Sequence, residues 1–184
     1  MLSDLIILDL CGGTGAWSEP YRQAGYDVRV VTLPHHDVRY YAPPSKVHGV
    51  LAAPPCTEFA VSGARWWKNK DPNLLRYALE VFDACWHIKE LVHPAFWAFE
   101  NPVGRLKKLR YSVLGEPRLI FHPCDYGDPH TKKTLLWGTF NLPTKSPVFP
   151  VEGSKMWAKY GGGCSEARSI TPPGFAKAFF RANP

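Results

Sequence analysis

A cysteine that follows two prolines, Cys56 in the stretch A-P-P-C-T-E-F, is a candidate for a chemical role. The apolar run V-H-G-V-L-A-A just before it predicts a buried strand over residues 47–53. Because Pro54 and Pro55 restrict the backbone, a side chain after that strand would be held toward a cleft, where a thiolate can act as a nucleophile. The alternative is a small buried thiol, the commoner fate of a cysteine.

A carboxylate stands in a comparable place on another predicted strand. Glu100, in F-E-N-P, ends the apolar run F-W-A-F. A carboxyl group that enters a cleft from apolar surroundings could donate a proton near neutral pH. The alternative is a strand-end acid that caps a helix or is solvated. Neither Cys56 nor Glu100 decides the chemistry alone.

The first apolar run, L-I-I-L-D-L, leads into the glycine-rich stretch D-L-C-G-G-T-G, from Asp9 to Gly15. Glycines let the backbone turn sharply from a strand into a helix and approach a ligand closely. The alternative is a tight turn such as any α/β protein contains.

Cations and aromatics alternate in S-G-A-R-W-W-K-N-K, which includes Arg65, Trp66, Trp67, Lys68 and Lys70. This mixture suits phosphates and an unstacked base. An ordinary exposed loop with its tryptophans folded back on the core is an equal alternative. Lys132 and Lys133 could support a site, or they could be solvated charges at a strand end.

The elements that must position these residues alternate between strands and helices. Apolar runs predict strands over residues 5–10, 26–32, 47–53, 96–101, 118–122 and 134–138. Helical spacing predicts helices over 17–24, over 72–92 behind an N-cap at Asp71, and over 172–180 behind an N-cap at Thr171. The alternation predicts an α/β fold, a mostly parallel open sheet with helices on both faces and ligands beyond the carboxyl ends of its strands.

The length of 184 residues predicts one domain, residues 1–184, in which 139–167 is a Pro-, Gly- and Ser-rich loop or a vestigial insertion. Without an apolar run long enough to span a membrane, and without a basic region or cleavage site in M-L-S-D, the sequence predicts neither a membrane span nor export. Five widely spaced cysteines without C-x-x-C pairs predict neither a disulfide framework nor a metal site, and fit the cytoplasm. The formal charge of +6 favours a polyanionic partner.

In order and spacing, these segments resemble the DNA cytosine-carbon-5 methyltransferase family over most of the chain. D-L-C-G-G-T-G-A-W-S is similar to its first cofactor motif, P-P-C-T-E-F to its Pro-Cys motif, and Glu100-Asn101-Pro102 to its Glu-Asn-Val triplet. Asp125-Tyr126-Gly127 with Pro129 and Lys132 resembles a later Tyr-Gly-Val-Pro segment, and Arg168-Ser169-Ile170-Thr171-Pro172 resembles the Arg-x-Leu-Thr-Pro motif.

The resemblance implies a Rossmann-like class I methyltransferase fold, S-adenosylmethionine as methyl donor, and DNA, duplex or single-stranded, as partner. Catalysis would fall to Cys56, which adds to carbon 6 of cytosine, and to Glu100, which acts at ring nitrogen 3. The implied donor site comprises Asp9, Cys11, Gly12, Gly13, Gly15, Asp37 and Pro54. The implied substrate site comprises Arg65, Trp66, Lys68, Asn101 and Lys132.

Departures from the family keep alternatives open. Thr32 stands where the family has a ribose-binding acid, and a target-recognition domain could occupy only the short stretch from Thr139 to Ala167. The reduced form suggests a bacterial or phage-infected cell, with a separate specificity subunit or a homo-oligomer still open. The alternatives are a non-catalytic nucleic-acid-binding relative and a methyltransferase that acts on RNA or on a free cytosine nucleotide.

Overall fold

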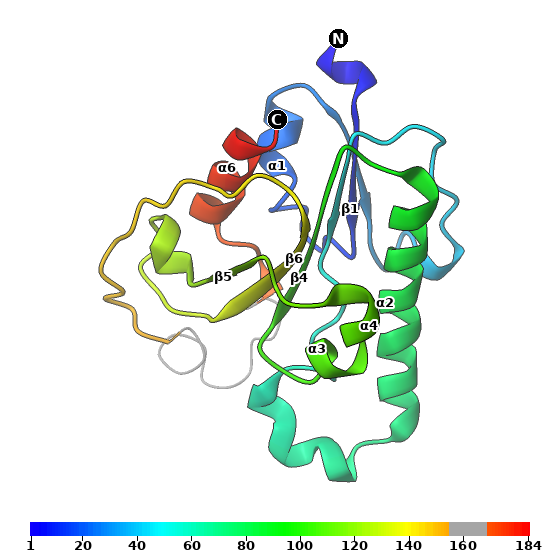
Figure 1. Cartoon of the computed structure of the whole chain (residues 1–184), viewed down its shortest axis with the longest axis vertical. Helices are drawn as coiled ribbons and strands as arrows, with labels where there is room; N and C mark the ends of the chain where they lie inside the picture. Colours follow the sequence, from blue (N-terminus) through cyan, green and yellow to red (C-terminus); the bar gives the residue numbers. More distant parts are fainter. Residues whose placement is uncertain (155–168) are drawn as a thin grey trace.

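Six strands form one sheet in the order β2-β1-β3-β4-β6-β5 (Figure 1). The computed structural model describes residues 1–154 and 169–184. The strands are β1 (Ile6–Leu10), β2 (Asp27–Val31), β3 (Gly49–Ala52), β4 (Phe96–Pro102), β5 (Leu119–Phe121) and β6 (Thr134–Thr139). β2, β1, β3 and β4 pair in parallel, whereas β6 runs antiparallel to both β4 and β5. The predicted α/β fold with a mostly parallel open sheet is confirmed.

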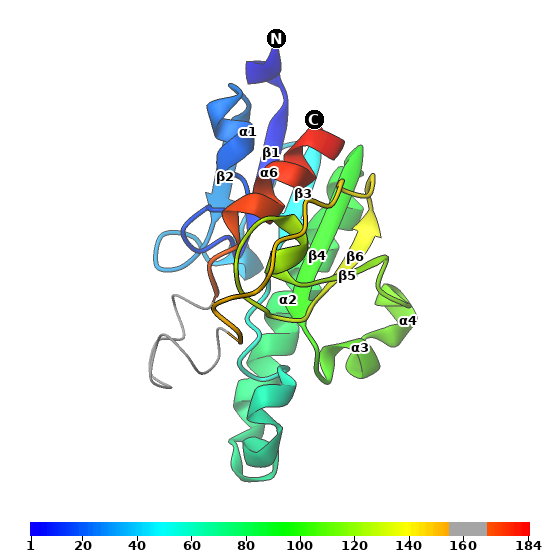
Figure 2. The same cartoon turned by 90° about the vertical axis from the view of Figure 1, so that its left-hand side faces the viewer.

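Helices cover both faces of this sheet (Figure 2), as predicted. On one face, α2 (Pro72–Val92) contributes Phe82, Cys85 and Ile88 to a core that also contains Leu8 of β1 and Phe99 of β4. On the other face, α1 (Glu19–Gln23) and α6 (Pro173–Ala182) bury aromatic side chains. The central strands β1, β3 and β4 are largely buried on both sides, which is the usual pattern of a parallel sheet.

The ends of α2 follow local sequence signals. The Asp71 side chain accepts a hydrogen bond from the backbone N–H of Asn73, so the predicted N-cap is confirmed. At the other end, His93 adopts a left-handed conformation and Pro94 follows, which stops the helix.

The predicted N-cap of α6 is wrong. Pro172, and not Thr171, occupies that position, and it makes no side-chain capping hydrogen bond. Instead, the Asp128 carboxylate accepts a hydrogen bond of 3.0 Å from the backbone N–H of Gly174. A side chain distant in sequence thus satisfies a donor at this helix start.

Several short elements were not predicted. They are the 3-10 helices η1 (Leu2–Asp4), η2 (Val38–Tyr40), η3 (Val61–Asn69) and η4 (Pro123–Tyr126), and the single-turn helices α3 (Leu106–Leu109) and α4 (Tyr111–Leu114).

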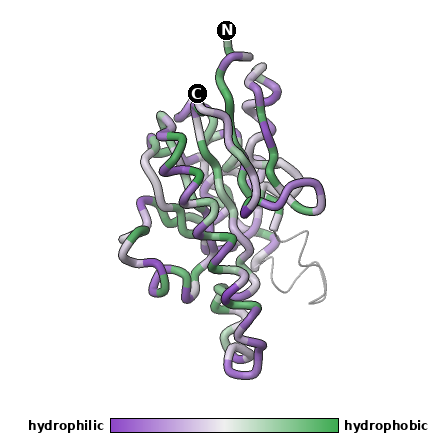
Figure 3. Tube along the Cα trace, turned by 90° about the vertical axis from the view of Figure 1, so that its right-hand side faces the viewer, coloured by the Kyte–Doolittle hydropathy of each residue, from purple (hydrophilic) through white to green (hydrophobic). Residues whose placement is uncertain are grey.

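A hydrophilic tip of the chain, where η3 turns into α2, projects at the lower end of the molecule in Figure 3. The predicted loop contains no helix or strand over residues 140–150, and its part 155–167 lies outside the described residues.

No helix in the described ranges is both long enough and apolar enough to cross a membrane.

Candidate active site

The three segments singled out for chemistry meet at one edge of the sheet. β1, β3 and β4 are parallel neighbours, so their carboxyl ends lie together. The glycine turn follows β1, the Pro54–Cys56 loop follows β3, and Glu100 and Asn101 lie in the last part of β4. We refer to this side as the catalytic edge.

Backbone hydrogen bonds hold the glycine turn between its neighbours. The N–H of Cys11 donates to the carbonyl of Val31 at 2.8 Å, and the N–H of Ala53 donates to the carbonyl of Leu10 at 3.0 Å. Gly13 has φ 55°, and a Cβ placed there would meet nothing within 4 Å. The turn therefore presents its backbone to open space, which is what close approach of a ligand requires.

Asp9 lies beneath this turn and is fully buried. One carboxylate oxygen accepts a hydrogen bond of 2.5 Å from the Ser18 hydroxyl, and a Cβ at Gly12 would come within 2.4 Å of the carboxylate carbon. Its other oxygen has no hydrogen-bond partner among the residues that the structure describes. Burial raises the pKa of Asp9 from 3.8 to about 6, and the Ser18 hydrogen bond offsets only part of this effect.

This burial has a consequence for stability. Since the unfolded chain loses the Asp9 proton near pH 3.8 and the folded chain near pH 6, the folded state binds more protons between these values. The free energy of unfolding should therefore fall as pH rises from about 4 to about 6 and stay lower above it, by up to ~3 kcal/mol.

Replacing Asp9 by asparagine, which stays neutral, should remove this loss. Urea unfolding of both proteins from pH 3.5 to 7.5 should show the variant gaining stability relative to the unchanged protein through that window, with a plateau above pH 6. Other titrating groups cancel in the difference. A difference that stays flat with pH would contradict the assigned burial effect.

The thiol of Cys11 does not point into open space. Its sulfur lies 3.8 Å from the sulfur of Cys85 on α2, and Cys11 itself adopts a left-handed backbone with φ 57°. This contact, together with burial, raises the pKa of Cys85. Any contact of Cys11 with a ligand would therefore come from its backbone.

Asp37 precedes η2 and is bound on both oxygens by Arg39. The shortest contact, 2.6 Å, joins Arg39 Nη2 to Asp37 Oδ2, and the Arg39 backbone N–H donates to Oδ1. The guanidinium holds the pKa of Asp37 below its usual range. A ligand at Asp37 would share a carboxylate that is already oriented and charged.

The Cys56 loop and the end of β4 are joined through Asn101. Asn101 is fully buried, and its Nδ2 donates to the carbonyl of Pro54 at 3.0 Å. After Cys56 the chain turns tightly, because the Cys56 carbonyl accepts hydrogen bonds from Phe59 and Ala60. This position of Asn101 favours a supporting role for the cysteine loop over the substrate contact implied by the resemblance.

Lys132 lies in the segment that leads into β6, and its side chain is close to Glu100. Its Nζ lies 3.7 Å from Glu100 Oε1, and both side chains are about one-fifth exposed. Glu100, Lys132 and Thr134 line a small hollow together with Ser169 and Thr171, which precede α6. Ser169 and Thr171 were not among the predicted site residues, because only the folded chain brings 169–171 back to β4.

The aromatic and basic residues after Cys56 separate into two groups. Arg65, Trp66 and Lys68 of η3 are exposed, with the Arg65 guanidinium 5.0 Å from the Trp66 ring centre. Lys70 instead forms a 2.7 Å ion pair with Glu58, and Trp67 packs under Arg105. The exposed trio can meet a polyanion, whereas Lys70 and Trp67 stabilise the loop.

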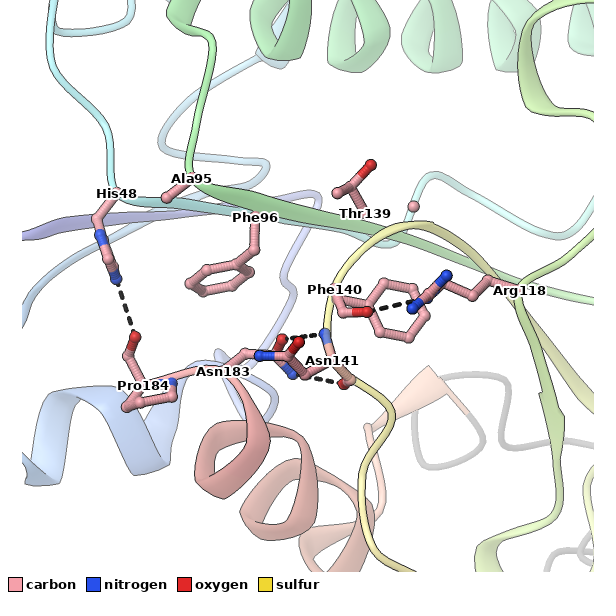
Figure 4. A pocket seen from close by; sticks show the side chains of 10 residues that line it. His48, Ala95, Phe96, Arg118, Thr139, Phe140, Asn141, Asn183 and Pro184 are labelled. Atoms are coloured by element: carbon pink, nitrogen blue, oxygen red, sulfur yellow. Dashed lines mark hydrogen bonds between the residues drawn. The ribbon is translucent and has the colours of Figure 1, made fainter.

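A larger cavity, of about 390 Å³, lies at the opposite edge of the sheet (Figure 4). Its polar groups bond to one another: His48 with the Pro184 carbonyl, Arg118 with the Phe140 carbonyl, and Asn183 with Asn141. The bonds of Pro184 and Asn183 attach the chain after α6 to the sheet and to the segment that follows β6. The cavity is remote from Cys56 and Glu100, and we assign it no part in their chemistry.

Comparisons with known proteins identify the fold. No family model matches the chain, and no curated protein matches it in sequence. A solved structure that does match is a proposed DNA modification methyltransferase encoded within a prophage of E. coli. It is 17% identical, with a TM-score of 0.54, and the match covers 79% of this chain and 53% of that one. The chain thus has a Rossmann-like α/β fold of the kind found in that protein and spans about half its length.

Proposed function

We propose that this chain transfers a methyl group from S-adenosylmethionine to carbon 5 of cytosine in DNA, with Cys56 as nucleophile. The observation that supports this most strongly is the link between Pro54 and Asn101, which joins the loop of Cys56 to the strand of Glu100. Lys132 adds a cation beside that carboxylate. The similar fold of a proposed prophage DNA modification methyltransferase also supports it.

The glycine turn fits the proposed donor. Gly12, Gly13 and Gly15 would let its backbone approach the donor, with Pro54 bordering the turn and Asp37 supplying a charged acceptor. When bound, S-adenosylmethionine supplies an electrophilic methyl group. Asp9 is proposed to hold the turn through Ser18 rather than to touch the donor.

The residues of the chain would act on the base in a fixed order. The Cys56 thiolate forms a bond to carbon 6 while Glu100 holds a proton at ring nitrogen 3, so carbon 5 gains electron density. After methylation a base removes the carbon-5 proton, and the Cys56–carbon 6 bond breaks. Lys132 lies 3.7 Å from Glu100 and could hold that side chain in place toward the base.

The target base must leave its stack to reach Cys56, which costs a few kcal/mol in duplex DNA and less in a single strand. Arg65, Trp66 and Lys68 are exposed on η3, directly after the cysteine loop. Contacts to phosphates and stacking on Trp66 would offset that cost.

Methyl transfer itself is tested with radiolabelled S-adenosylmethionine and matched cytosine-containing substrates: single-stranded DNA, duplex DNA, RNA and free nucleotide. The proposal expects labelled 5-methylcytosine in DNA, identified by mass spectrometry of the digested product. Label on an exocyclic amino group, or preferential labelling of RNA or nucleotide, would contradict it.

Asp37 should contribute to donor affinity. Replacing it by alanine should weaken S-adenosylmethionine binding by about 1–3 kcal/mol in calorimetry, since a half-buried hydrogen bond is lost. Asp27→Ala is a matched control. Asp27 pairs with Arg29 as Asp37 pairs with Arg39, but Asp27 lies at the start of β2, away from the glycine turn. Equal affinities of both variants would remove Asp37 from the donor site.

A further inference from the structure

The segment after β4 concentrates positive charge. Residues 103–118 contain five basic residues and one acidic residue, so they carry most of the formal excess of +6 in the chain. They include α3 and α4, which lie at the same end of the molecule as η3 (Figures 1 and 2). We call residues 103–118 the basic arm.

Backbone contacts fix the basic arm to the chain that follows Cys56. The Val61 N–H donates to the Val103 carbonyl at 2.8 Å, and the Arg105 N–H donates to the Phe59 carbonyl at 2.9 Å. Gly104 is required between them, because a Cβ there would lie 1.8 Å from the Phe59 carbonyl oxygen. The start of the arm is therefore fixed to the chain that leads from the cysteine loop into η3.

Most cations of the arm have a structural partner. Arg105 donates to the Glu58 carbonyl and lies 4.4 Å from the Trp67 ring centre. Lys107 pairs with Glu116 at 2.6 Å and Arg110 with Asp83 at 2.7 Å. The contacts of Arg105 and Arg110 anchor the arm to the rest of the protein, whereas the Lys107–Glu116 pair lies within the arm.

Lys108 and Tyr111 differ from these anchoring residues. Both are exposed, and Tyr111 keeps 52% of its surface accessible. Within residues 1–154 and 169–184, Lys108 has no ion pair. A solvated ammonium group, followed three residues later by an accessible aromatic ring, is a combination with which proteins bind single-stranded nucleic acids, the cation at a phosphate and the ring at a base.

We propose that the basic arm is a second wall of the DNA-binding face, on which Lys108 contacts a phosphate and Tyr111 stacks on an unpaired base beside the target. This rests on the proposed function for the identity of the polyanion as DNA. Together with the exposed residues of η3, it would add contacts to the strand outside the cysteine loop. The arm would thereby add affinity without reading sequence, since phosphates and base faces are common to every sequence.

Equilibrium binding of the full chain to fluorescent single-stranded DNA at several salt concentrations tests this. Lys108→Ala should lower the affinity and reduce the slope of log affinity against log salt by about 0.7, the value for one phosphate contact. Tyr111→Ala should weaken binding by roughly tenfold, whereas Tyr111→Phe, which keeps the ring, should bind as the unchanged protein does.

Lys46→Ala is the charge-matched control. Lys46 is exposed just before β3 begins, at the edge opposite to Cys56, so its loss should leave affinity and salt slope nearly unchanged. Circular dichroism and S-adenosylmethionine binding show whether each variant keeps its fold. If folded Lys108→Ala and Tyr111→Ala variants bind like Lys46→Ala, the arm is not part of the face.

The outcomes separate this inference from the proposed function. If the protein methylates DNA and the Lys108→Ala and Tyr111→Ala variants bind DNA normally, the role of the arm in binding is overturned and the proposed function stands. If DNA binding depends on salt and needs Lys108 and Tyr111 but no methyl transfer occurs, the role of the arm in binding is supported and the proposed function is overturned. Tighter, arm-dependent binding of the same strand as RNA would overturn the assignment to DNA.

Discussion

Cys56→Ser should reduce methyl transfer by more than ~10⁴-fold while the fold and donor binding stay close to unchanged. A serine hydroxyl is similar in size to the thiol, but it is a far weaker nucleophile at neutral pH. The rate is measured by transfer of label to single-stranded DNA at saturating donor. Cys124→Ser, a change at another partly exposed cysteine, is the control and should stay active.

The same cysteine should be trapped by DNA that contains 5-fluorocytosine. Fluorine cannot leave carbon 5 as a proton would, so the bond from Cys56 to carbon 6 persists after methylation. Mass spectrometry should find the adduct on Cys56 in the unchanged protein and in Cys124→Ser. Methylation of ordinary cytosine without any adduct on Cys56 would refute the covalent route.

Glu100→Gln should lower methyl transfer by about 10²–10⁴-fold, because the amide keeps the shape of the side chain but cannot supply a proton. The result should appear in the rate at saturating substrates, with DNA affinity little changed. Glu90→Gln, on the surface of α2, removes one carboxylate remote from the catalytic edge and is the control. A Glu100→Gln enzyme as fast as this control would exclude Glu100 from catalysis.

Cys56 and Glu100 are expected to act in one step, so their effects should not add. The double variant should be scarcely slower than the slower single variant. Independent effects that multiply would instead indicate that the two residues act at different stages.

The main elements of the fold could be predicted because their signals are local. The runs around Leu8, Val50 and Phe99 are predominantly apolar, which is typical of strands covered on both faces, and Asp71-Pro72 marks the start of α2. The antiparallel direction of β6 could not be predicted, since a strand pattern carries no information on which way its partner runs. α3 and α4 are too short for periodicity to reveal them, and η3 is a 3-10 helix, whose period of three residues differs from that of an α-helix.

In the candidate site, too, the features that local sequence signals could predict differ from those that depend on long-range packing. Cys56, Glu100 and the glycine turn stand at strand ends, so the sequence alone placed them at one edge of a parallel sheet. That Asp9 is buried beneath the turn, and that Asp37 is bound by Arg39, depends on side-chain packing that a motif does not encode. Lys132 reaches Glu100 only because β6 returns antiparallel to β4.

Both ends of the chain lie at the side of the sheet away from Cys56 (Figure 1), and the bond between His48 and the Pro184 carbonyl holds one of them there. A tether attached at Met1 or Pro184 would therefore leave the catalytic edge facing solution. Molecules immobilised on a glass surface through either end could receive a stretched DNA strand from above, so that individual binding events can be timed.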